Sequence, residues 1–145
     1  MAETDLTART AVPRPPSFDV LPRQRCLELL SATTVGRIAF TGRDGPVLLP
    51  VNYRVVGDAV VLRTSRSGTL AQLAGADAEV VFEVDYHAPT SRSAWSVLVR
   101  GTARVVEDPH VLDAAEVSRG VSWVPGDHAL VLAVPLDRVT GRSVG

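Results

Sequence analysis

The chain contains no lysine, and all 15 of its basic residues are arginines. This absence excludes a phosphate-binding loop that ends in Gly-Lys-Ser or Gly-Lys-Thr. It also excludes a lysine Schiff base, and with it the usual covalent use of pyridoxal phosphate. An anion bound by this chain is therefore held by arginine, hydroxyl groups, backbone N–H groups or helix dipoles.

The chain also has a single cysteine, a net charge close to zero and no long apolar run. Cys26 is the only cysteine and no signal-peptide pattern is present, so we expect a reducing, cytoplasmic location. A formal charge of −1 argues against nucleic acid or anionic lipid as the principal partner. No apolar run approaches the roughly 20 residues of a membrane span, so no membrane partner is expected.

Metal-binding and hydrolytic motifs are missing as well. The histidines at positions 87, 110 and 128 lie far apart and form no metal-ligand pattern, so we predict no metal site. The chain has neither a Gly-x-Ser-x-Gly elbow nor a Gly-x-Gly-x-x-Gly fingerprint. Cys26 joins an apolar helical stripe and is predicted to be structural.

The 145 residues, 46% of them hydrophobic, are enough for one domain with a real core. Prolines crowd the first 22 residues, so we predict a flexible N-terminal arm over residues 1–17 and a single domain over 18–145. An arm that exchanges as a strand with a second subunit is the alternative interpretation.

Three short helices are predicted. The first is capped by Asp19, has Pro22 in its first turn and ends within residues 31–34. Its apolar stripe consists of Cys26, Leu27, Leu29 and Leu30. The others span residues 69–74, stopped by Gly75, and 109–118, capped by Asp108.

Alternating and β-branched segments predict about six strands, over residues 35–40, 47–56, 59–64, 80–86, 94–106 and 130–139. Gly101 indicates a bend in one strand, and Pro135 indicates an edge or a strand end. Short turns join most of them, which favours a mainly β fold, a closed antiparallel barrel, over a parallel sheet with crossover helices.

A polar segment, Arg-Thr-Ser-Arg-Ser-Gly-Thr-Leu at residues 63–70, leaves a strand and enters a helix. Two arginines, four hydroxyls and the N–H groups of a helix start are the groups that phosphate requires. The alternative is an ordinary polar turn with solvated arginines.

Two further segments are candidates for a pocket. Pro50, Val51, Asn52 and Tyr53 lie on the preceding strand, where a planar heterocycle could hydrogen-bond to the main chain; a strand bulged by Pro50 is the alternative. Trp95 starts another strand and either walls a pocket or joins the core. Trp123 lies in a loop, as a lid or subunit contact would.

Five motifs in order carry a family resemblance: Val-Gly-Arg-Ile-Ala-Phe (35–40), Pro-Val-Asn-Tyr (50–53), Arg-Thr-Ser with Gly-Thr (63–69), Phe-Glu-Val-Asp (82–85) and Trp-Ser-Val-Leu-Val-Arg-Gly (95–101). They resemble the pyridoxamine 5′-phosphate oxidase-like flavoproteins, in the small actinobacterial-type branch. The resemblance covers about residues 20–143 and includes Thr-Gly-Arg at 140–142.

The resemblance implies a six-stranded antiparallel split β-barrel of the FMN-binding type, which forms a homodimer with FMN at the interface. Residues 82–85 would be mainly structural. Three groups of residues would bind the cofactor: Arg63, Thr64, Ser65, Gly68 and Thr69 around the phosphate, with Arg66 as a further cation; Pro50, Val51 and Asn52 along the ring; and Trp95 and Ser96 from the other subunit. Trp123 is added from its loop position alone.

Two departures from the family pattern bear on function. Leu70 stands where many relatives carry a lysine after Gly-Thr, and the chain lacks the C-terminal Arg-x-His of true pyridoxamine-phosphate oxidases. We therefore expect a flavin-dependent oxidoreductase with a small organic substrate, but not a true pyridoxamine 5′-phosphate oxidase, and we assign no catalytic acid or base. The alternatives are a non-catalytic flavin-binding or cofactor-free dimer, or a reductase that uses the deazaflavin F420.

Overall fold

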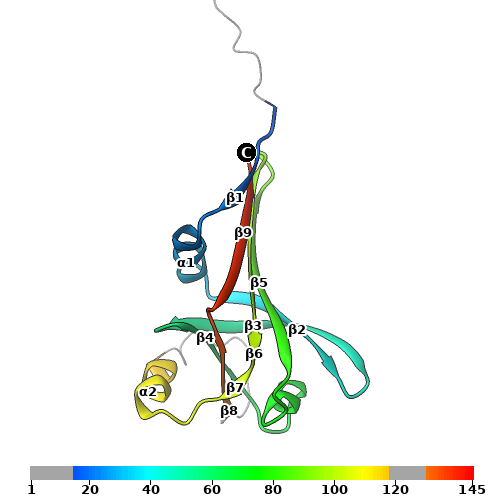
Figure 1. Ribbon diagram of the computed structural model, residues 1–145, viewed down its shortest axis with the longest axis vertical. Coiled ribbons are helices and arrows are strands. Elements are labelled where there is room, and N and C mark those ends of the chain that lie inside the picture. Colours follow the sequence, from blue (N-terminus) through cyan, green and yellow to red (C-terminus); the bar gives the residue numbers. More distant parts are fainter. Residues whose placement is uncertain (1–14, 118–129) are drawn as a thin grey trace, which may run out of the picture.

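The computed structural model describes residues 15–117 and 130–145 (Figure 1). The strands are β1 (Phe18–Leu21), β2 (Val35–Gly42), β3 (Gly45–Val56), β4 (Ala59–Thr64), β5 (Glu79–Ala88), β6 (Ser93–Thr102), β7 (Arg104–Val105), β8 (Leu130–Pro135) and β9 (Arg138–Val144). The helices are α1 (Arg23–Ser31), α2 (Pro109–Val117) and the 3₁₀ turn η1 (Thr69–Leu73). No helix within the described ranges has the length and apolar character needed to cross a membrane.

The nine strands form one antiparallel sheet in the order β1-β9-β6-β5-β2-β3-β4-β8-β7. The sequence-based expectation of a mainly β split barrel with short helices is confirmed. The expectation of a closed barrel is wrong, because the hydrogen-bonded order begins at β1 and ends at β7. Strand β3 pairs with β2 through residues 45–52 and with β4 through residues 53–56, so it joins the two halves.

The strand count exceeds six partly because two predicted strands are divided. The segment predicted at 94–106 breaks at Ala103, and the segment at 130–139 breaks after Pro135, which lacks a backbone N–H group for the ladder. Pro135 also lies over Gly101, where an added Cβ would be 3.3 Å from the Pro135 ring. The bend expected at Gly101 therefore occurs two residues later, at Ala103.

The start of the domain differs from the prediction. Residues 18–21 form β1, paired with β9, so Asp19 is not a helix cap. Helix α1 starts at Arg23, after an extended Pro22, and has no side-chain cap. Ser17 continues the pairing, because its N–H group donates to Gly145 O and its carbonyl oxygen accepts a return bond from the Gly145 N–H group, both at 3.2 Å. Residues 1–14 of the predicted arm lie outside the described residues.

Alternation along the strands divides the sheet into two faces. We call the face that packs on α1 and the core the inner face, and the opposite one the outer face. Directly paired residues share a face. Fully buried inner-face side chains include Ile38, Phe82, Val84, Val97 and Val99.

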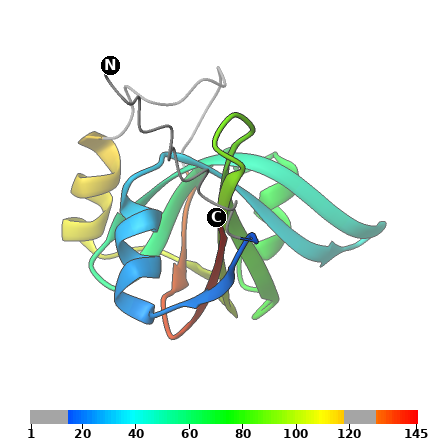
Figure 2. The ribbon, with the colours of Figure 1, turned by 90° about the horizontal axis from the view of Figure 1, so that it is seen from above.

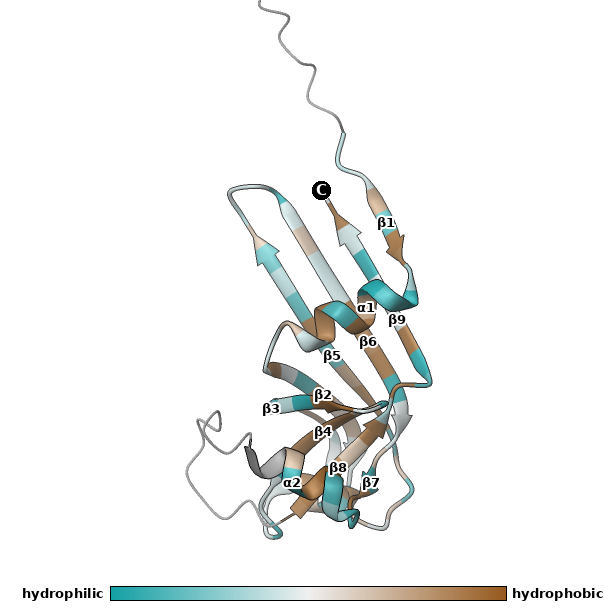
Figure 3. Cartoon of the chain, turned by 90° about the vertical axis from the view of Figure 1, so that its left-hand side faces the viewer, coloured by the Kyte–Doolittle hydropathy of each residue, from teal (hydrophilic) through white to brown (hydrophobic). Residues whose placement is uncertain are grey.

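Helix α1 lies across β6 and β9, and the strands β5, β6, β9 and β1 continue beyond it (Figures 2 and 3). Its residues Cys26, Leu29 and Leu30 are buried, as the apolar stripe predicts. Burial raises the pKa of the Cys26 thiol. A Cβ on Gly141 would lie 2.5 Å from Cys26 Sγ, so only glycine allows this helix to approach β9 so closely.

Tyr53 ties α1 to β3. Its hydroxyl donates a hydrogen bond to the carbonyl of Leu30 and lies 2.9 Å from Thr33 Oγ1. Its ring meets Phe82 edge to face, with the ring centroids 4.7 Å apart. Burial raises the pKa of the Tyr53 phenol. The C-terminal end of α1 is therefore fixed to the strand that joins the halves of the sheet.

Replacing Gly36 with alanine should strongly destabilise the fold. The added Cβ would lie 2.4 Å from Phe82 Cζ and 2.8 Å from Glu83 O. We expect the free energy of unfolding in urea to fall by about 1–3 kcal/mol, as in overpacked cores. Gly101→Ala is the control, since its added Cβ meets nothing closer than 3.3 Å and should cost less. Equal losses in the two variants would contradict this packing.

Tyr53→Phe should lower the free energy of unfolding at neutral pH by about 1–3 kcal/mol, because the Leu30 carbonyl loses its buried donor. The phenol has a raised pKa in the folded state, so its contribution is fully present below about pH 10 and is lost as the pH rises through the folded value. The variant should lack this alkaline loss in urea titrations. A variant as stable as the wild type at neutral pH would refute the anchoring role.

Candidate functional site

The polar segment at the end of β4 folds into a compact turn. Ser65 Oγ lies 2.9 Å from Ser67 Oγ and accepts a hydrogen bond from the Ser67 N–H group at 3.2 Å. The N–H group of Gly68 donates to Ser65 O, also at 3.2 Å. A Cβ on Gly68 would lie 3.6 Å from Thr64 Oγ1. The structure thus brings Thr64, Ser65 and Gly68 together, as the sequence predicts.

Arg63, on β4, places a positive charge next to this turn. Arg63 is partly buried with a buried Nε atom, and it pairs with Val131 on β8, whereas Arg66 and Thr69 are exposed. The η1 turn has only five residues, so the helix dipole expected there is small. Leu70 is 5% exposed and packs in the core, so its position cannot present a charge to the turn.

The β3 segment adjoins the turn through its outer face. Pro50 pairs with Arg37 and Asn52 with Val35, which places both on that face, while Val51 points inward. The β3–β4 ladder stops at Tyr53–Leu62, so Asn52 and Arg63 are the first residues beyond its last pair on the two strands. Residues 50–52 are not paired with β4, because the β3–β4 ladder ends at Tyr53–Leu62.

Sequence reasoning missed a charged cluster beside Pro50. Arg37 donates hydrogen bonds to Glu83 and Asp85, each at 3.0 Å, and these bonds, the one to Asp85 first, raise the pKa of the guanidinium. The mainly structural role expected for the motif at 82–85 fits Phe82 and Val84, which are buried. The alternation of charged with buried residues was the signal that could have revealed the cluster.

Trp95 and Ser96 lie elsewhere in the chain. Trp95 packs against the edge of the core and stacks on Tyr86, with the ring centroids 6.3 Å apart and 56% of Tyr86 exposed. Ser96 pairs with Asp85 on the outer face. Six residues, or about 20 Å of strand, separate Trp95 from Gly101, the part of β6 that meets β8. Trp95 and Ser96 pair only with β5 and β9, whereas the turn follows β4, which pairs with β3 and β8. Trp123 lies outside the described residues.

The outer face also exposes apolar side chains. Phe18 and Val20 on β1 are 62% and 78% exposed, and Leu48 on β3 is 66% exposed. The guanidinium of Arg142 lies over the Phe18 ring, with its Cζ atom 5.4 Å from the ring centroid. The strands β9, β6, β5 and β2 separate Leu48 from Phe18 and Val20, so only the two residues of β1 form a local apolar patch of the kind that meets a partner.

These groups fit a phosphorylated, planar ligand. The guanidinium of Arg63 and the hydroxyl groups of the turn are donors suited to a phosphate. The outer face beside Pro50 and Asn52 offers a flat edge with an amide for a heterocycle. The two parts are connected through the last pair of the β3–β4 ladder, Tyr53–Leu62, beyond which Asn52 and Arg63 follow.

Known proteins are similar to this chain in sequence and in fold. The family model described as pyridoxamine 5′-phosphate oxidase matches residues 22–143. The uncharacterized protein Rv0080 of Mycobacterium tuberculosis is 36% identical over 129 residues, which are 86% of this chain and 84% of that protein.

Several solved structures have the same fold as this chain. The FAD binding protein from Mycobacterium smegmatis has a TM-score of 0.70 at 30% identity, with 86% of this chain and 96% of that chain covered. A putative pyridoxamine 5′-phosphate oxidase from Corynebacterium glutamicum has a TM-score of 0.69 at 28% identity, with 87% and 92% covered. An FAD-binding protein from Mesorhizobium loti, at 21% identity, shares the fold with a TM-score of 0.77 over 90% and 99%. The sequence match, the antiparallel split barrel and these neighbours together show that the chain belongs to the pyridoxamine 5′-phosphate oxidase family.

Proposed function

We propose that the protein is a flavin-dependent oxidoreductase for a small organic substrate, with the flavin bound between two copies of the chain. The observation that carries this proposal is the position of Asn52 and Arg63 just beyond the last β3–β4 pair, with the polar turn of residues 65–68 following Arg63. Family membership adds support, as does the FAD-binding description of the protein from M. smegmatis.

Each residue then has a defined role. Arg63, Thr64 and Ser65 hold the flavin phosphate through charge and hydroxyl donors, and Gly68 lets the ligand approach the backbone. Thr69 adds a hydroxyl and Arg66 an exposed cation. Bound flavin would supply the hydride and electron transfer.

The ring would lie along the outer face of β3. Pro50 and Asn52 present side chains there, and Val51 contributes its main chain. Trp95 and Ser96 would reach this ring from the second copy, since in their own chain they belong to β6, which does not pair with β3 or β4. The exposed apolar side chains of Phe18 and Val20 on β1 support such a homodimer.

FMN is the flavin we propose, with FAD, which two of the solved relatives are described as binding, and F420 as the alternatives. The mass of the molecule that co-purifies with the protein distinguishes all three.

A non-catalytic or cofactor-free dimer is the second candidate function, and buried Leu70 favours it. The chain carries leucine where many relatives carry a lysine, so one phosphate-neutralising charge is missing. A flavin that is reduced by a nicotinamide donor and reoxidised by an organic substrate would support the enzyme. A colourless dimer that ignores added FMN would support the alternative.

Arg63→Gln should weaken FMN binding because it removes a charge-assisted phosphate donor. Such bonds contribute about 1.5–3 kcal/mol, which corresponds to roughly ten- to hundredfold in the dissociation constant. Fluorescence titration of apoprotein with FMN measures the change. The matched control is Arg25→Gln, which removes an exposed guanidinium paired with Glu28 on α1. Equal affinity of the Arg63 variant and the control would overturn the phosphate assignment.

A complementation experiment tests the shared site. Arg63→Gln and Trp95→Ala should each weaken FMN binding, the first on the phosphate side and the second on the ring side. Mixed and refolded together, they should regain tight sites, because each heterodimer combines an intact Arg63 from one copy with an intact Trp95 from the other. If each site belonged to a single chain, the mixture would bind no better than the separate variants.

A further inference from the structure

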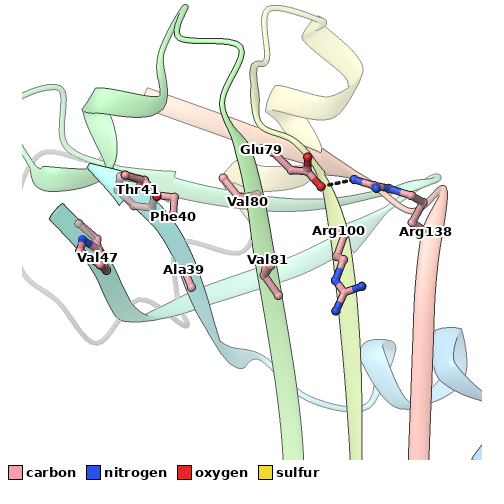
Figure 4. A pocket seen from close by; sticks show the side chains of 10 residues that line it. Ala39, Phe40, Thr41, Val47, Glu79, Val80, Val81, Arg100 and Arg138 are labelled. Atoms are coloured by element: carbon pink, nitrogen blue, oxygen red, sulfur yellow. Dashed lines mark hydrogen bonds and ion pairs between the residues drawn. The ribbon is translucent and has the colours of Figure 1, made fainter. Parts of the chain in front are cut away.

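A groove of about 510 Å³ opens on the sheet at the end nearest the β2–β3 turn (Figure 4). Its apolar lining comes from β2, β3 and β5, with Ala39, Phe40, Val47 and Val81 among the contributors. Arg100 on β6 and the ion pair of Arg138 with Glu79 supply the charges. None of these residues belongs to the proposed flavin site.

The charges of the groove do not cancel. Arg100 pairs directly with Arg138 across β6 and β9, and like charges at such positions destabilise a sheet. Glu79 binds Arg138 but not Arg100, which takes part in no ion pair within the described ranges. Figure 4 shows the guanidinium of Arg100 turned away from Arg138 and toward the level of Val81. Two arginines and one glutamate leave one positive charge beside an apolar surface.

We propose that this groove binds a small organic monocarboxylate with a flat apolar body. The guanidinium of Arg100 takes the carboxylate through two parallel N–H···O bonds, the geometry that suits it best. The apolar body lies over Ala39, Phe40 and Val81. A single negative charge matches the single excess positive charge, whereas a phosphate dianion would exceed it by one.

The proposal does not depend on flavin binding. The groove residues are separate from Arg63 and from the turn at residues 65–68, so the groove can bind its ligand whether or not flavin is present. It lies on the same sheet as Pro50, since Arg100, Val81 and Ala39 form one cross-strand row that ends at Leu48 on β3. Pro50 is only two residues from Leu48.

Benzoate, with the neutral benzamide as its isostere, tests the proposal on the full-length protein at low ionic strength. Benzoate should shift the ¹⁵N–¹H resonances of Ala39 and Val81 and the Nε–H resonance of Arg100, and benzamide should not. Benzoate should also raise the melting temperature, as any ligand of the native state does. This comparison uses only the wild-type protein, so its result does not depend on whether a variant folds.

Arg100→Gln should weaken benzoate binding about tenfold or more, because a charge-assisted pair is lost. Its own melting temperature should not fall, since the substitution also removes the contact of like charges with Arg138. Arg104→Gln is the matched control, because Arg104 is exposed on β7 and interacts with Asp77 at 3.5 Å, outside the groove. It should bind benzoate as the wild type does.

Three results would overturn the proposal. Benzamide could bind as well as benzoate, which would leave Arg100 without a role. Arg100→Gln could retain full benzoate affinity. The third result is that neither benzoate nor benzamide shifts the resonances of the groove residues, as expected if a second copy of the chain covers the groove.

Discussion

Strand β3 hydrogen-bonds to β2 along residues 45–52 and to β4 along residues 53–56. This division of one strand between two partners holds the halves of the split barrel in a fixed relation. Tyr53 stands at the division and is tied to the end of α1 through Leu30 and Thr33. The change of partner also leaves Asn52 and Arg63 as the first residues beyond the last β3–β4 pair, so the same constraint that organises the sheet positions the candidate site.

The inner face of the sheet forms the core, and the outer face carries the groups proposed to bind ligands. Inner-face residues such as Ile38, Phe82 and Val97 are fully buried and form the core. The outer face carries the Arg37 cluster, the exposed apolar side chains and the groove at Arg100. Because adjacent residues of a strand point to opposite faces, a core motif and a binding motif occupy the same few positions. The motif at 82–85 shows this directly, since Phe82 and Val84 are buried while Glu83 and Asp85 hold Arg37.

The sequence was sufficient for features that depend on near neighbours. Strand β4 has the predicted bounds, Gly75 has the left-handed backbone expected of a stop, with φ of 70°, and the hydroxyl-rich turn forms as a unit. Features that depend on distant partners were missed. Phe18–Leu21 became a strand because β9 lies beside it, although the nearby Asp19 and Pro22 resembled a helix start. The open order of the sheet likewise follows from pairings that no local pattern records.

The antiparallel bonds between Ser17 and Gly145 place the two ends of the folded domain on neighbouring strands. A short loop could therefore join these ends without disturbing the sheet, since termini that lie together tolerate circular permutation. New ends could then open in the exposed turn at Arg43 and Asp44, where the Arg43 N–H group donates to Gln72 Oε1. Such a rearranged chain would carry a fused reporter at the tip of the β2–β3 hairpin.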